Sequence, residues 1–97
     1  NHGEAVAIGM VCAAYISKSL GMIDQSVVDR VISLILKLHL PIKAQGCTVA
    51  DLYRDIFHDK KTVGGKVKWI LMESIGQVCG NSNVPEDIVK GAMQKII

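Results

Sequence analysis

Asn1-His2-Gly3-Glu4 runs directly into Ala5-Val6-Ala7-Ile8-Gly9-Met10-Val11-Cys12-Ala13-Ala14-Tyr15-Ile16. Every position from Ala5 to Ile16 is apolar or glycine, so no polar face recurs at the helical period. A helix that is apolar all round is buried all round, in a large core or in a membrane. The stretch is too short for a membrane span, which needs about 20 residues. We therefore predict a central helix over residues 3–20, packed on every side and ended by a left-handed cap at Gly21.

The composition is that of one globular domain with more hydrophobic residues than a free-standing domain of this size needs, which indicates apolar surface that packs against another segment or protein. The chain has 97 residues, of which 49% are hydrophobic and 21% charged. The net charge of +2 is spread along the chain, so we expect neither a nucleic-acid partner nor binding to a membrane surface. Because the chain also starts without methionine, we expect it to be a piece of a longer polypeptide that supplies part of the packing around the first helix.

The three cysteines, Cys12, Cys47 and Cys79, are odd in number, far apart and in no CxxC pattern. This usage is typical of reduced thiols, with Cys12 acting as a small core residue. We expect no signal peptide before the first helix. We therefore expect a cytoplasmic location.

Three further helices are predicted from caps and apolar periodicity. The second starts at Asp24 or Ser26 and ends at Leu40-Pro41, since a residue before proline avoids the helical region. The third covers residues 49–58 behind the capping pair Thr48 and Asp51. The last begins at Pro85, which suits a first helical turn. The core faces predicted for these helices consist of Val27, Val28, Val31, Ile32, Ile35, Leu36 and Leu38, then Leu52, Tyr53 and Ile56, then Ile88, Val89, Ala92, Met93 and Ile96.

A single small hairpin is predicted between the third and last helices. Val63-Gly64-Gly65 is a glycine turn, and residues 66–72 alternate before becoming wholly apolar, which is a strand signal. After a turn at residues 73–76, residues 77–79 form the partner strand. The fold class expected from the sequence is therefore mainly α, with one small β-hairpin, in one domain over residues 1–97.

His2 is the first candidate for chemistry. A neutral imidazole at the start of a rigid helix is a good zinc ligand, and Glu4 could orient it or could simply favour the helix dipole. Spacing alone does not favour a metal site, because zinc takes at least three protein ligands and neither HxxxH nor CxxC accompanies His2. His39 and His58 are predicted to be partly exposed surface histidines.

Asp59-Lys60-Lys61 is the second candidate. Two lysines after a helix place cations near the negative end of its dipole, which is the simpler interpretation. The functional alternative is that a lysine contacts an anionic substrate group while Asp59 fixes its direction. The glycines that follow do not form a phosphate-binding loop, because the GxxxxGK[ST] spacing is absent.

The motifs, taken in order, resemble those of one enzyme family. His2-Gly3-Glu4-Ala5-Val6-Ala7-Ile8-Gly9-Met10 is similar to the HGEAVAxGM signature of the 3-dehydroquinate synthases, and Leu20-Gly21, Leu40-Pro41, Asp59-Lys60-Lys61, Leu71 and Ile75-Gly76 continue the similarity. The HGE element is shared with glycerol dehydrogenases and other sugar-phosphate cyclases. The Asp-Lys-Lys element favours the synthases. Residue 39 is a departure, because it is His where the family usually has glycine.

The resemblance implies a helical C-terminal domain whose N-terminal NAD-binding α/β domain lies outside this chain. It implies that His2 is the last of three zinc (or cobalt) ligands, the other two lying upstream, and that Lys60 contacts the anionic end of the substrate. The implied cofactors of the intact enzyme are NAD and the metal. We expect neither to be tightly bound by this chain alone.

The implied reaction is a step of the shikimate pathway. The family converts 3-deoxy-D-arabino-heptulosonate 7-phosphate into 3-dehydroquinate and phosphate, with NAD carrying the hydride chemistry and the metal acting as a Lewis acid. With one metal ligand of three, the chain alone is expected to be inactive, to bind zinc weakly, and to self-associate as a homodimer or a larger assembly. The alternatives are a related NAD- and metal-dependent enzyme, such as a glycerol dehydrogenase or another cyclase, and a non-catalytic helical interaction module.

Overall fold

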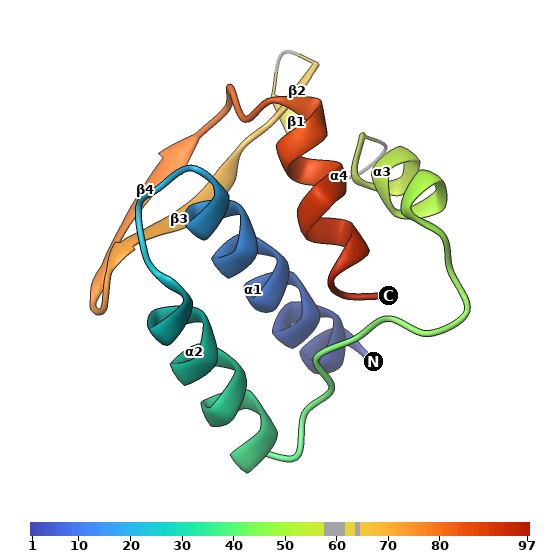
Figure 1. Cartoon of the computed structure of the whole chain (residues 1–97). Coiled ribbons are helices and arrows are strands. Elements are labelled where there is room, and N and C mark those ends of the chain that lie inside the picture. The colour runs from blue at the N-terminus through green and yellow to red at the C-terminus, as the bar shows by residue number, and fades with distance from the viewer. Residues whose placement is uncertain (58–61, 64) are drawn as a thin grey trace.

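Helix α1 (His2–Ser19) is the element against which most of the chain packs, as the computed structural model shows (Figure 1). It contacts α2 (Gln25–Lys37), strand β3 (Trp69–Ser74) and α4 (Glu86–Gln94). Helix α3 (Val49–Phe57) lies on the far side of α4. The structure describes residues 1–57, 62–63 and 65–97, without the side chains of residues 57, 62 and 63. His58, Asp59, Lys60, Lys61 and Gly64 lie outside the described residues.

The predicted mainly-α fold with a small hairpin is confirmed. β3 and β4 (Gln77–Asn81) pair antiparallel, with Leu71 opposite Cys79 and a register irregularity between Met72 and Ser74. A shorter antiparallel pair, β1 (Thr62–Val63) with β2 (Lys66–Val67), also appears in the described part of the chain. Sequence reasoning placed Lys66 in the longer strand and did not predict β1. In the structure, Lys68 belongs to no strand and divides the predicted strand into β2 and β3.

The helix starts follow their caps closely. α1 begins at His2, one residue earlier than predicted, because the Asn1 side chain accepts a hydrogen bond from the Glu4 N–H at 2.9 Å. Asp24 caps α2, as predicted. α4 begins at Glu86, one residue later than predicted, with Pro85 at its N-cap. Thr48 Oγ1 accepts the Asp51 N–H at 3.1 Å, which confirms the predicted cap of α3. Gly21 ends α1 with a φ of 77°, as predicted.

α2 ends earlier than predicted, at Lys37, because its last turn closes before the proline. The His39 N–H donates to the Leu36 carbonyl at 3.0 Å and the Leu40 N–H to the Ile35 carbonyl at 3.2 Å. These two bonds form a Schellman motif, in which the residue at the left-handed position is usually glycine. Here that residue is His39, with a φ of 59°. The residue where the resemblance expects glycine therefore has the backbone conformation that glycine favours.

We predict that His39→Gly stabilises the chain. A non-glycine residue in the left-handed region costs about 1–2 kcal/mol, and part of the gain is offset by the larger backbone entropy of glycine in the unfolded chain. The free energy of unfolding should rise by roughly 0.5–1 kcal/mol in urea titration. His39→Ala, which keeps the strained φ, is the control and should show no gain. Equal stability of the Gly and Ala variants would contradict the prediction.

The core lies between α1, α4, β3 and α2. Its main cluster consists of Ala7, Val11, Cys12, Ile16, Ile35, Leu71, Val89, Ala92, Met93 and Ile96. Most predicted core residues of α4 are in this cluster, and Leu52, Tyr53 and Ile56 of α3 pack against it half-buried. The prediction for Leu36 and Leu38 is wrong, because both are exposed. Val6 is 45% and Met10 51% exposed, so the described residues do not pack around every side of α1, and the expectation that a longer polypeptide supplies the rest stays a prediction.

Ser17 is the one fully buried polar residue among those whose burial is described. Its Oγ accepts a hydrogen bond from the Met72 N–H of β3 at 3.0 Å, which fixes the hairpin on α1. We expect Ser17→Ala to leave that strand N–H unpaired and to lower the free energy of unfolding by about 1–3 kcal/mol. Ser19→Ala, on the exposed side of the same helix, should change it by less than about 0.5 kcal/mol in the same urea titration. Similar losses in both variants would exclude this role for Ser17.

Candidate functional site

A broad groove of about 1390 Å³ runs over the face of α1 that the described residues leave uncovered. Residues of α1 and α2 line it together with residues of the β3–β4 hairpin. Six large apolar side chains that line the groove are exposed: Val6, Met10, Leu34, Ile70, Ile75 and Val78. Contiguous apolar surface of this kind is typical of a contact face. The groove therefore marks where the expected packing partner of α1 would lie.

His2 lines this groove from the first turn of α1, and it is exposed. The described residues contain no group of three or more His, Cys, Asp or Glu side chains placed to hold a metal ion. The role of His2 as a metal ligand stays a prediction. Further ligands would have to come from outside the described residues.

Glu4 has a structural role that sequence reasoning did not assign. Its carboxylate Oε1 accepts a hydrogen bond from the Asn1 amino nitrogen at 3.3 Å, while its own N–H donates to Asn1 Oδ1. Together these bonds form a capping box. The signal was present in the spacing of Asn1 and Glu4. The box fixes where α1 starts and therefore where the His2 backbone lies.

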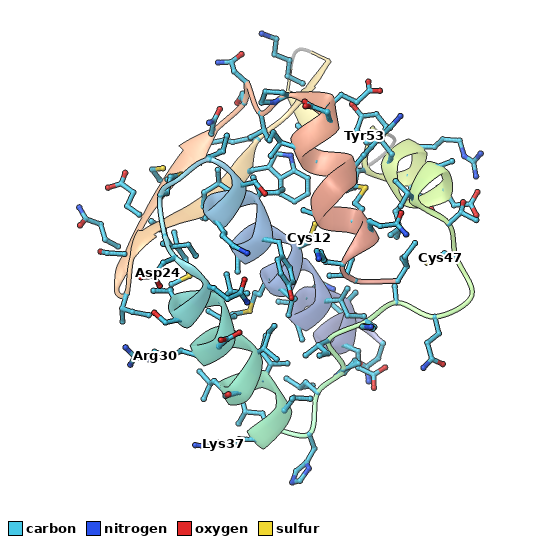
Figure 2. The ribbon with its side chains drawn as sticks, viewed as in Figure 1. Cys12, Asp24, Arg30, Lys37, Cys47 and Tyr53 are labelled. Atoms are coloured by element: carbon cyan, nitrogen blue, oxygen red, sulfur yellow. The ribbon has the colours of Figure 1, made fainter. Side chains whose placement is uncertain are left out.

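The cysteines do not extend this site. Cys12 is a buried residue of α1 (Figure 2), and burial raises the pKa of its thiol to about 12. Such a thiol stays protonated at neutral pH and is a poor ligand or nucleophile. All three cysteines are free, in agreement with the prediction of reduced thiols.

Lys60, the second predicted site residue, lies outside the described residues, as do Asp59 and Lys61. The structure does describe the elements on either side of it, α3 and β1. Leu52 and Ile56 of α3 line the same groove as His2. The groove therefore reaches from the His2 end of α1 to the helix that precedes Lys60 in sequence. His39 is exposed, as predicted, and is not among the residues that line the groove.

Comparison with known proteins identifies the family. A sequence model described as 3-dehydroquinate synthase C-terminal matches residues 1–62, which include His2 and Lys60. The chain belongs to the 3-dehydroquinate synthase C-terminal family. The resemblance seen in the sequence is thereby confirmed.

Curated relatives match over nearly the whole chain. A 3-dehydroquinate synthase from Synechocystis sp. is 45% identical over 94 residues, covering 96% of this chain and 26% of the relative. One from Sulfurovum sp. is 39% identical over 94 residues, with 97% and 27% covered. One from Acidithiobacillus ferrooxidans is 41% identical over 93 residues, with 96% and 26% covered. The chain thus spans about a quarter of the length of these relatives.

No helix in the described ranges is long and apolar enough to cross a membrane.

Proposed function

We propose that this chain is the C-terminal part of a cytoplasmic, NAD- and zinc-dependent 3-dehydroquinate synthase, a phosphate lyase. The full protein would convert 3-deoxy-D-arabino-heptulosonate 7-phosphate into 3-dehydroquinate and phosphate. The observation that carries the proposal is that relatives of this name match about 96% of the chain at 39–45% identity. The groove supports it, because α1 presents an apolar face that the rest of a longer protein would cover.

His2 would supply one zinc ligand. Its imidazole is exposed and lines the groove, on a helix whose start is fixed by the Asn1–Glu4 capping box. Residues outside this chain would complete the ligand set. When bound, the ion would act as a Lewis acid on a substrate oxygen, and NAD would supply hydride transfer.

Lys60 would bind the substrate. A lysine ammonium is a compact cation that suits a phosphate or carboxylate group. The groove supports a shared site, because His2 lines one part of it and α3, just before Lys60, lines another. In this proposal, Lys60 would hold the anionic end of the substrate and His2 would hold the metal ion.

The test uses the full-length protein with NAD, zinc and the heptulosonate phosphate, and follows phosphate release and NADH absorbance together. Phosphate release without accumulation of NADH is the expected result, because the hydride returns within each turnover. NADH accumulation with glycerol or another polyol, and no phosphate release, would place the protein among the related dehydrogenases instead. The 97-residue chain alone is expected to release no phosphate and to bind no stoichiometric zinc.

We also propose that the isolated chain self-associates through the groove, as a homodimer or a larger assembly. Light scattering over a concentration series should show a mass above that of the 10.5 kDa monomer, because exposed apolar surface of this extent favours association. Met10→Lys, which places a charge in the groove, should shift the species toward monomer. Gln94→Lys adds the same charge on exposed α4 outside the groove and should not. A wild-type monomer at the highest concentration would refute this proposal.

A further inference from the structure

Three cations line the groove that crosses α1. Arg30 and Lys37 belong to α2, and Lys68 belongs to the link between β2 and β3. All three are exposed, and the described part of the chain gives none of them an ion pair or a hydrogen bond. Asp29 is the one carboxylate among the described groove residues, and its Oδ1 accepts a hydrogen bond from Gln25 Nε2 at 2.9 Å. The groove therefore has an excess of positive charge.

The cations are set among apolar side chains that also line the groove. Arg30, Leu34 and Lys37 have the spacing of one helix face, and Figure 2 shows Arg30 and Lys37 on the same side of α2. The exposed side chain of Leu34 therefore lies between two charges. Lys68 is directed by the hairpin, because its aliphatic chain lies across Gly80, where a Cβ would collide with it.

The groove face of α1 has room for another helix. Ala5, Gly9 and Ala13 recur at a four-residue spacing and line the groove, and a Cβ at Gly9 would meet nothing within 4 Å. Val6 and Met10 line it as well and are exposed. Small residues let the backbone of a second helix come close, while the larger side chains fit between those of that helix. An apolar groove of this kind suits an amphipathic helix.

We infer that an amphipathic helix with acidic flanks covers this groove, and that it comes from the part of the longer protein outside these 97 residues. The inference rests on the part of the proposed function that makes this chain a piece of a longer synthase. The apolar stripe of the helix packs on α1, and its carboxylates pair with Arg30, Lys37 and Lys68. Complementary charges of this kind fix the register of an interface and disfavour wrong partners.

Charge disfavours a second copy of the chain as the occupant in the full protein. A copy would bring the same excess of cations to the groove, and like charges that face each other oppose association. Self-association of the isolated chain is compatible with this, because no acidic helix then competes for the apolar surface. The chain spans 26% of the Synechocystis relative, so a protein of that length has enough other residues to supply the helix.

The experiment treats the full-length protein with a carbodiimide, which joins a lysine amine to a carboxylate in direct contact, and maps the linked peptides by mass spectrometry. Lys37 and Lys68 should link to one segment outside the 97 residues, whose carboxylates recur every three or four residues beside an apolar stripe. Their yield should be at least about five-fold above that of Lys43 and Lys95, which are exposed and do not line the groove. Arg30→Lys, which keeps the charge and adds an amine, should add a link to the same segment.

A mixture of light and heavy isotope-labelled protein, left to exchange, distinguishes the occupants. The expected links each join peptides of one isotope. Mixed-isotope links from Lys37 and Lys68 would identify a second copy as the occupant and overturn the inference, and so would equal yields at all four lysines. Phosphate release is measured on the same protein before cross-linking. Its absence would overturn the proposed reaction, while the cross-links would still decide whether an acidic helix covers the groove.

Discussion

Replacing His2 with alanine in the full-length protein is expected to lower phosphate release at least about 100-fold and to remove stoichiometric zinc. Loss of a residue that merely supports a metal ligand already costs about 10–100-fold, and loss of a ligand should cost more. The fold should survive, because the His2 side chain is exposed and fills no core space. The capping box between Asn1 and Glu4, which starts the helix, stays intact in this variant. Metal analysis and the phosphate assay are the two measurements.

The control for His2 is His39→Gly, which removes another exposed histidine from outside the groove. It should keep full zinc content and turnover while gaining stability. If His2→Ala retained both zinc and phosphate release, His2 would not be a metal ligand, whatever the family of the chain. If it lost turnover but kept zinc, the residue would act on the substrate instead. Far-ultraviolet circular dichroism of each variant checks that helix content is unchanged.

Helix starts and ends could be predicted from the sequence because their causes are local. Asp24 and Thr48 each accept a hydrogen bond from an N–H three residues on, and Gly21 takes a positive φ within its own turn. The capping box of Asn1 was missed although its spacing was visible. The end of α2 was predicted at Leu40, because the residue before a proline avoids the helical region. The helix ends earlier, at Lys37, because His39 takes a positive φ.

Burial was harder to predict because it depends on which neighbours the fold brings near. Apolar periodicity selected Val28 and Ile35 correctly but also Leu36 and Leu38, which are exposed. Val6 and Met10 belong to a helix with a wholly apolar central stretch, yet no element in the described part of the chain covers them. An apolar sequence pattern predicts that a helix face is buried. It does not predict whether the segment that covers this face belongs to the same 97 residues.

The candidate site likewise has residues that a local pattern predicts and contacts that only the fold creates. His2 and Lys60 could be selected from motifs, because a signature keeps its spacing in sequence. The contact of Tyr53 with Glu86 joins residues 33 positions apart, and no local pattern predicts it. Sequence reasoning placed Tyr53 on the core face of its helix. Its ring does pack beside the core, but its hydroxyl is hydrogen-bonded to an exposed carboxylate on α4.

Leu71→Ala is expected to lower the free energy of unfolding of the 97-residue chain by about 2–5 kcal/mol, which is a large part of the stability of a domain this size. Leu71 is fully buried, at 0% exposure, and joins the main core cluster from the face of β3 that meets α1. Removing its side chain leaves a cavity at the contact that holds the hairpin on the helix. Urea titration at low protein concentration measures the loss without self-association.

Ile70→Ala removes a side chain of the same size one position earlier, on the opposite face of the same strand. Ile70 is 56% exposed, so little apolar area returns to water on unfolding and the cost should stay below about 1 kcal/mol. The comparison separates packing from strand propensity, because Ile is the stronger strand former of the two and yet its replacement should cost less. Equal losses would mean that β3 is not packed on α1 through Leu71. A loss confined to Leu71 would establish that the hairpin is part of the core even in the isolated chain.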